Sequence, residues 1–215
     1  MSRKTRRNPY DSSRRREQAR ERQERMLEAA RRSFAEKGYR ETTIGEIAKQ
    51  AGVSVPTVYA AFGSKRGILS RLLGRLVSGE PGGPPVLQTS RAQEVMRNPD
   101  RRRALQDFAR HMREILARVA PVHFMIRSAA RSEPELAELL SEMQRNRFNN
   151  MRALARSLAA TGPLHDSMKL DDAARTIWVL ASAEVRQLLI EQAGWSEARY
   201  EKWLAGTLTS SLLPR

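Results

Sequence analysis

The stretch TTIGEIAKQAGVSVPTVYAAFGSK, residues 42–65, contains two short helical patterns separated by AGVS. Thr43 and Glu46 have the Thr-x-x-Glu spacing of a capping box, which predicts the start of the first helix. Gly52 suits a tight turn after that helix, and Ser54 suits the N-cap of the second. Neither helix is long enough to be stable alone. We therefore expect the two helices to pack together as a helix-turn-helix unit.

The same unit meets the steric needs of a steep helix crossing. Ala48 is small enough for close approach, Gly52 provides the turn, and Val58 gives the second helix an inward apolar contact. The second helix, residues 55–62, would then present its N-terminal end to a DNA groove. A pattern of this length also fits a turn between two packed helices that bind no DNA.

Helical periodicity flanks this unit on both sides. Apolar residues repeat on one face of a helix that ends near Gly38, and again on a helix that begins after Ser64. These faces predict the core of a small helical domain. They are formed by Met26, Leu27, Ala30 and Phe34 before the unit, and by Ile68, Leu69, Leu72 and Leu73 after it.

The segment from Met26 to Leu73 resembles the DNA-binding domain of the TetR (tetracycline-repressor) family. The length of the chain and its helical remainder also fit this family, so the resemblance extends over nearly the whole sequence. The motifs that carry it are Gly38-Tyr39, Thr42-Thr43, Ile47-Ala48, Ala51 to Ser54, Thr57-Val58-Tyr59, Phe62, Ser64-Lys65 and Ile68-Leu69.

This resemblance implies a regulator whose recognition helix contacts DNA and whose Thr43, Tyr59 and Lys65 hold phosphates. One departure is that Pro56 and Ala60 stand where the family often has a glycine and a polar residue. Both are apolar, so they would contact a thymine methyl group rather than donate hydrogen bonds to base edges. The expected DNA-contacting residues are Thr43, Ser54, Val55, Pro56, Thr57, Tyr59 and Lys65.

The charge of the chain favours a polyanionic partner. Its 215 residues carry a net charge of +15, and residues 1–70 alone hold 17 Lys+Arg against 8 Asp+Glu. The alternative is a genome with biased arginine usage, because 33 of the 39 basic residues are arginine. Residues 1–19 are rich in arginine and almost devoid of apolar side chains, so we expect a disordered basic arm. Such an arm could follow DNA phosphates or be an ordinary solvated tail.

The remaining sequence indicates an all-α fold of two domains. The Pro- and Gly-rich residues 78–85 suggest a boundary between a DNA-binding domain, residues 20–78, and a helical effector-binding and dimerisation domain, residues 86–215. Within the second domain we expect helices at residues 99–119, 122–132, 134–161, 170–193 and 196–213, separated by Pro121, Pro134 and Gly162-Pro163.

The last two predicted helices, residues 170–193 and 196–213, carry broad apolar surfaces. The resemblance implies that they pair with their copies in a homodimer, and a protein that reads a palindrome needs such two-fold symmetry. The alternative is that both surfaces belong to the core of one subunit.

A ligand pocket is a further expectation for this domain. Met and aromatic side chains make adaptable apolar walls, although each candidate also fits an ordinary core position. Polar residues that interrupt the helix at 134–161 could add polar contacts. The expected lining residues are His111, Met112, Ile115, Phe124, Met125 and Trp178, and the polar candidates are Asn146, Arg147, Asn149 and Asn150.

Other classes of function find little support. The chain has no cysteine, and His111 and His123 lack the spacing of helical metal ligands, so we expect neither a metal nor another cofactor. Without a phosphate loop, a nucleophile elbow or paired carboxylates, an enzyme is not expected. Without a secretory signal or a membrane span, we expect a cytoplasmic protein. The sequence thus predicts a DNA-binding transcriptional regulator, most simply a ligand-released repressor; the alternative is a non-specific architectural DNA-binding protein.

Overall fold

The structure is a computed structural model that describes residues 9–80, 83–165 and 168–214. The chain divides into two compact units, Met1–Leu72 and Leu73–Arg215. The division falls inside a helix, before the Pro- and Gly-rich residues 78–85. All regular structure in the described residues is helical, which confirms the predicted all-α fold.

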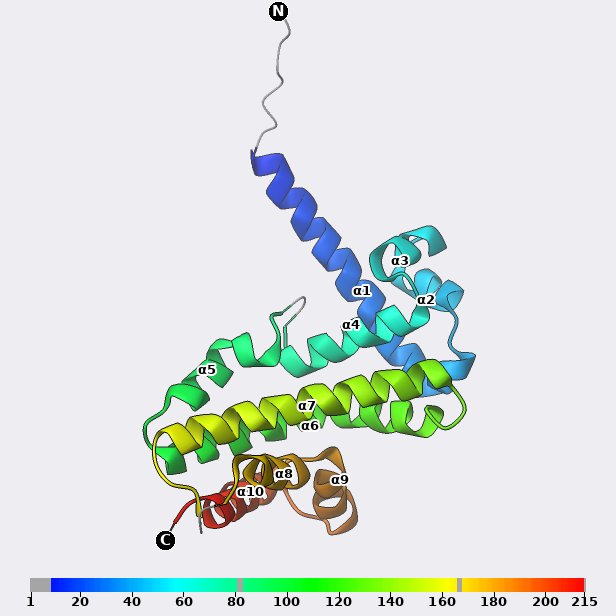
Figure 1. Ribbon diagram of the computed structural model, residues 1–215. Helices are drawn as coiled ribbons and strands as arrows, with labels where there is room; N and C mark the ends of the chain where they lie inside the picture. Colours follow the sequence, from blue (N-terminus) through cyan, green and yellow to red (C-terminus); the bar gives the residue numbers. More distant parts are fainter. Residues whose placement is uncertain (1–8, 81–82, 166–167, 215) are drawn as a thin grey trace, which may run out of the picture. The chain divides into compact units, whose positions relative to one another are not determined.

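The helices of the first unit are α1 (Pro9–Glu41), α2 (Ile44–Ala51), α3 (Val55–Phe62) and the first half of α4 (Lys65–Ser78). In Figure 1, α2 lies beside the C-terminal part of α1, and α3 follows beside α2. A buried apolar cluster holds the unit together, and it includes the core residues predicted on either side of the helix-turn-helix. Its members include Met26, Leu27, Ala30, Phe34, Ile47, Ala48, Val58, Ile68, Leu69 and Leu72.

Helix α1 begins earlier than the sequence predicted. Residues 9–19 were expected to belong to a disordered arm, but they form the first turns of α1; residues 1–8 of that arm lie outside the described part of the chain. Residues 14–25 mix Arg with Glu at helical spacing, which supports a solvated helix once the packed turns near Met26 have formed. Gly38 interrupts α1 with φ 74° and ψ 180°, a conformation that favours glycine.

The second unit consists of longer helices around one apolar core. Helices α6 and α7 run alongside each other, and α8 and α10 pack against them (Figure 1). Its elements are η1 (Val86–Gln88), α5 (Ser90–Arg97), α6 (Arg101–Ala129), α7 (Pro134–Ala160), α8 (Leu170–Leu180), α9 (Ala183–Arg186), the π-helical turn η3 (Gln187–Gln192) and α10 (Glu197–Leu212).

Two helix boundaries differ from the prediction in opposite ways. Pro121 was expected to end a helix, but α6 continues through it. Pro121 and Ala117, whose carbonyl loses its helical partner there, are both exposed, so water can satisfy that carbonyl. The helix predicted at residues 170–193 is instead broken after α8, because Ser182 adopts an extended backbone and its Oγ accepts a hydrogen bond from the Val185 N–H (3.1 Å).

Helix α5 was not predicted. Its N-cap is Thr89, whose Oγ1 accepts a hydrogen bond from the Ala92 N–H (3.3 Å), and its buried residues are Ala92 and Val95. Its brevity explains why periodicity alone did not reveal it. No helix in the described part of the chain is long and apolar enough to cross a membrane.

Candidate DNA-binding site

Local hydrogen bonds define the turn between α2 and α3. Thr43 Oγ1 accepts from the Glu46 N–H, and Glu46 Oε2 accepts from the Thr43 N–H, both at 3.2 Å, so the predicted capping box is present. Gly52 is left-handed (φ 66°), and the Val53 N–H donates to the Ala48 carbonyl (3.0 Å). These bonds fix the direction in which α3 leaves α2.

Ser54 occupies the N-cap of α3 through its backbone, but its side chain does not cap the helix as expected. Its Oγ instead shares a hydrogen bond with Thr57 Oγ1 (2.8 Å). The backbone carbonyl of Ser54 accepts from the N–H groups of Thr57 and Val58. The two hydroxyls therefore form one polar pair at the start of the helix.

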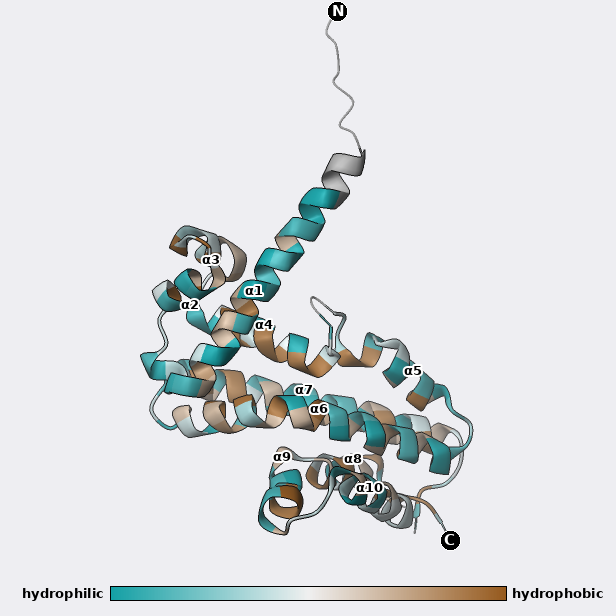
Figure 2. Cartoon of the chain, turned by 180° about the vertical axis from the view of Figure 1, so that it is seen from behind, coloured by the Kyte–Doolittle hydropathy of each residue, from teal (hydrophilic) through white to brown (hydrophobic). Residues whose placement is uncertain are grey.

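Helix α3 is held by one buried residue and exposes most of the others. Val58 is fully buried, whereas Tyr59 is 50% and Val55 38% exposed. Pro56 and Ala60 are also exposed, so the outer face of α3 combines apolar groups with hydroxyls. In the colours of Figure 2 this helix is mostly apolar or neutral. This face can pack against thymine methyl groups and can offer hydroxyl hydrogen bonds to bases or phosphates.

Helix α3 itself carries no basic residue. The usual arginine contact to guanine is therefore absent from the helix expected to read bases. Positive charge lies instead on the N-terminal half of α1, which Figure 2 shows as hydrophilic. The exposed arginines there are Arg14, Arg15, Arg16, Arg20, Arg22 and Arg25.

Lys65 lies at the start of α4, but its ammonium is already occupied. Nζ donates to the carbonyls of Tyr39 (2.9 Å), Thr42 (3.0 Å) and Arg40 (3.3 Å), and it lies 4.3 Å from the centroid of the Tyr39 ring. An ammonium has three N–H donors, and all three are used. The expectation that Lys65 Nζ holds a DNA phosphate is therefore not supported by this geometry. Lys65 instead ties the start of α4 to the chain that follows Gly38.

Thr43 remains available at the exposed start of α2. Its hydroxyl accepts one hydrogen bond within the capping box and keeps its own O–H for another partner. The neighbouring Glu46 carboxylate would repel a phosphate, but Lys37 Nζ lies 2.5 Å from Glu46 Oε1. The hydrogen bond from Lys37 lowers the pKa of Glu46. This pairing offsets the carboxylate charge beside Thr43.

Most of the expected effector residues lie in or against the core of the second unit. Met112 and Ile115 are buried in its core, and Phe124, Met125 and Trp178 are partly buried. His111 is also partly buried, and both of its ring nitrogens lack a hydrogen-bond partner. Burial, with Arg91 and Arg118 nearby, lowers the pKa of His111 to about 4, so its imidazole is neutral.

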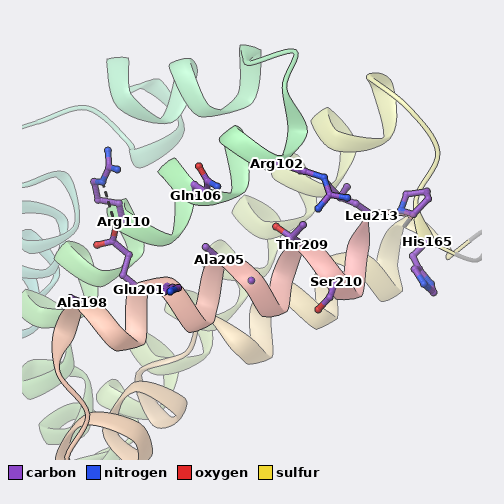
Figure 3. A pocket seen from close by; sticks show the side chains of 13 residues that line it. Arg102, Gln106, Arg110, His165, Ala198, Glu201, Ala205, Thr209, Ser210 and Leu213 are labelled. Carbon is purple, nitrogen blue, oxygen red and sulfur yellow. Dashed lines mark ion pairs between the residues drawn. The ribbon is translucent and has the colours of Figure 1, made fainter.

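A groove of about 780 Å³ lies elsewhere in this unit, between α6 and α10. Its lining includes Arg102, Gln106 and Arg110 on α6 and Glu201, Thr209 and Ser210 on α10, which are labelled in Figure 3. None of the six expected effector residues lines it. Sequence reasoning missed this groove because its walls come from helices about a hundred residues apart.

The first unit matches a protein-family model. Residues 26–72 fit the model described as bacterial regulatory proteins of the tetR family. The HTH-type transcriptional repressor BdcR of Escherichia coli (strain K12) is 39% identical over 57 residues, which are 26% of this chain and 29% of that protein. The chain thus aligns with less than a third of this curated relative.

Solved structures match over both units. A protein from Mesorhizobium loti assigned to the TetR family has a TM-score of 0.67 at 20% identity, covering 89% of this chain and 95% of that one. A protein from Saccharomonospora viridis assigned as a transcriptional regulator, solved with choline, has a TM-score of 0.64 at 21% identity, covering 90% and 98%. At these identities the likeness concerns the fold.

The capped helix-turn-helix, the matched family model and the shared all-helical fold all lead to one assignment. Residues 26–72 are a DNA-binding domain of the tetR family of bacterial regulatory proteins, and the chain as a whole shares its fold with a solved structure assigned to that family.

Proposed function

We propose that the protein binds a palindromic operator as a homodimer, represses transcription there, and is released by a small-molecule effector. Residues 20–78 would form the DNA-binding domain and residues 86–215 the effector-binding and dimerisation domain. The observation that carries this proposal is the exposed, apolar and hydroxyl-bearing face of α3 beyond a capped turn. Such a regulator acts at the chromosome, which in bacteria lies in the cytoplasm.

The proposed DNA contacts fall into two classes. Val55, Pro56, Thr57 and Tyr59 would meet base edges or phosphates from α3, while Thr43 would position the unit on the backbone. The exposed arginines of α1 would supply sequence-independent attraction to phosphates. The polar pair formed by Ser54 and Thr57 would bring hydroxyl donors to the start of the reading helix.

Dimerisation is supported by exposed apolar side chains near the end of α8 and in η3. Val179 is 50% and Leu188 53% exposed, and these apolar side chains could contribute to the apolar centre of a subunit interface. Two identical reading helices related by two-fold symmetry would then match a palindrome.

A small-molecule effector is supported by the fold. A structure of similar fold, that of the Saccharomonospora viridis protein, was solved with choline. In the proposed cycle, an effector changes the C-terminal helices and DNA affinity falls; DNA then weakens effector binding by the same factor.

A non-specific architectural role is the second candidate. It is favoured by the absence of basic residues on α3 and by the arginines along α1. Both roles are tested by selecting genomic DNA fragments with the purified protein at physiological salt. Enrichment of one palindromic motif supports the regulator. Enrichment without any motif, abolished by deletion of residues 1–25, would favour the architectural role.

A further inference from the structure

Three helices of the second unit bring a guanidinium, an indole and a phenol into one buried region. Arg147 comes from α7, Trp178 from α8 and Tyr200 from α10. The Arg147 Cζ lies 4.9 Å from the centroid of the Trp178 ring, and Tyr200 has no exposed surface. Arg147 and Tyr200 are also within electrostatic reach of each other, since each influences the other's pKa.

These three side chains hold buried polar atoms without a hydrogen-bond partner. The atoms are Arg147 Nε, Trp178 Nε1 and the Tyr200 hydroxyl. The first two can only donate, and a phenol O–H donates readily. A buried donor without an acceptor is costly and is rarely retained without a reason. The carboxylate of Glu197, which acts electrostatically on Tyr200, also has one unpartnered oxygen, Oε2, while its Oε1 accepts from Arg186 Nη2. Arg147, Trp178 and Tyr200 thus bring together three unpartnered atoms that can all donate.

The region also holds a positive charge that no nearby carboxylate neutralises. Within the described ranges, Arg147 has no salt-bridge partner, and burial lowers its pKa. Glu184 attracts it from a distance, but that carboxylate is engaged by His123 Nε2 (3.2 Å) and Arg127 Nη1 (2.7 Å). An uncompensated charge at a partly buried position is unfavourable unless a ligand supplies the counter-charge.

In place of a carboxylate, Arg147 forms a hydrogen bond with a backbone carbonyl. Its Nη2 donates to the carbonyl of Trp178 in the last turn of α8. That carbonyl lacks its usual helical donor, because the Ser182 N–H bonds to the Val179 carbonyl (3.2 Å). The guanidinium thus caps the C-terminus of α8. A stronger acceptor that recruited Arg147 would release this cap at the break between α8 and α9.

We propose that Arg147, Trp178 and Tyr200 form a receptor for the carboxylate of an organic acid, and that this acid is the effector. The inference rests on the proposed function, which assigns an effector to this unit. A carboxylate offers only acceptors, matches a guanidinium edge, and leaves the apolar body of the acid to pack on the indole. A cation is repelled by Arg147. A dianion such as a phosphate monoester is disfavoured because Glu184 and Glu197 act on the same groups.

The test is affinity selection with mass-spectrometric detection on the full-length, DNA-free protein. The probes are an equimolar mixture of aromatic acids and medium-chain fatty acids together with their primary amides. We expect acids to be retained at least about tenfold over their amides. Arg147→Gln should abolish this retention. Arg145→Gln, which changes an exposed arginine on the same helix, should leave it unchanged.

Because Arg147 also caps α8, its substitution could lower stability, so Tyr200→Phe provides a second test. Removing an unpaired buried hydroxyl should leave the melting temperature unchanged or raise it. The same substitution should weaken binding of a retained acid about tenfold, because it removes a donor to the carboxylate. If Tyr200 had a purely structural role, Tyr200→Phe would not weaken acid binding while leaving the melting temperature unchanged or higher.

The inference is overturned if the wild-type protein retains no acid, retains acids and amides alike, or keeps its acid binding after Arg147→Gln or Tyr200→Phe. DNA binding of the same preparations separates this failure from failure of the proposed function. A protein that selects a palindrome but retains no acid overturns only the carboxylate receptor. A protein that retains acids but selects no DNA motif overturns the regulator.

Discussion

Lys65 illustrates how one side chain can serve the fold of a DNA-binding unit rather than the DNA. Its ammonium donates to three carbonyls that follow Gly38 and lies over the Tyr39 ring. Tyr39 and Arg40 lie in the last turn of α1 and Thr42 lies just beyond it, where carbonyl groups have no donor within the helix. Lys65 thereby fixes the position of α4 relative to the end of α1 within the first unit.

Lys65→Ala should therefore destabilise the first unit by about 1–3 kcal/mol, since it leaves partly buried carbonyls unpaired. Hydrogen exchange should become faster in α2 and in residues 65–72, and remain unchanged in the second unit. The exposed Lys49→Ala on α2 serves as the control. If Lys65 instead held a phosphate, its removal would lower the salt dependence of DNA binding by about one counterion while leaving exchange unaltered.

The lowered pKa of Glu184 predicts that the stability of the second unit depends on pH. The hydrogen bond from His123, aided by Arg127, lowers the pKa of Glu184 from 4.5 to about 2. A depressed carboxyl pKa stabilises the folded state above pH 4.5, and that contribution is lost as the pH falls from 4.5 toward 2.

In an acid titration followed by tryptophan fluorescence, Glu184→Gln should be less stable than the wild type at neutral pH, and the gap should close by about pH 2. All three tryptophans lie in the second unit, so the signal reports on that unit alone. Glu138→Gln, an exposed position on α7, is the matched control. A gap that stayed constant with pH would show that Glu184 acts through packing rather than charge.

The exposed face of helix α3 is unusual for a helix that is expected to contact bases in DNA. It presents Val55, Pro56 and Ala60 beside the hydroxyls of Thr57 and Tyr59, and it carries no basic side chain. Apolar contacts in the major groove discriminate chiefly through the methyl group of thymine. Specificity should therefore come from thymines and from DNA shape more than from guanine contacts.

Replacing the thymines of the selected operator by deoxyuridine should then weaken binding. Removing the methyl group of each essential thymine should cost about 1 kcal/mol, or several-fold in Kd, as measured by fluorescence anisotropy. The same replacement outside the half-sites is the control. Unchanged affinity would mean that α3 reads bases through its hydroxyls instead.

For the molecule as a whole, the proposed two-fold assembly would link the two units to function. The exposed Val179 lies in the last turn of α8, and the exposed Leu188 lies in the π-helical turn η3, which follows the break after α8. π-Helical turns recur at functional sites because they re-aim side chains relative to a regular helix. The same break exposes the carbonyl that Arg147 caps. Effector binding and dimer packing would thus act on one short segment of chain.

Leu188→Glu should shift the protein toward monomer in analytical ultracentrifugation, because a buried charge without a partner opposes association. Binding to a full palindrome should fall by at least about tenfold, while the weaker binding to a single half-site should persist. Gln144→Glu, which adds the same charge at an exposed site on α7, should change neither property. A dimer that survives Leu188→Glu would place the interface elsewhere.

Features that depend on neighbouring residues were predictable from the sequence. The capping box of Thr43 and Glu46, the left-handed Gly52, the buried face of α1 and the all-helical fold follow from local propensity and apolar period. The charge of the chain likewise indicated a polyanionic partner. Each local signal spans only a few residues, and the net charge is a sum over the whole sequence. Neither kind of signal depends on which helices pack together.

Other features arise only where residues that are distant in the sequence come into contact. Periodicity did not reveal that α6 continues through Pro121, that Ser182 breaks the helix predicted at residues 170–193, or that Lys65 directs its donors to the carbonyls after Gly38. In each case burial and unpaired backbone groups decide the outcome, and both depend on which helix packs alongside. The meeting of Arg147, Trp178 and Tyr200 belongs to the same class, since three separate helices bring its unpartnered donors together.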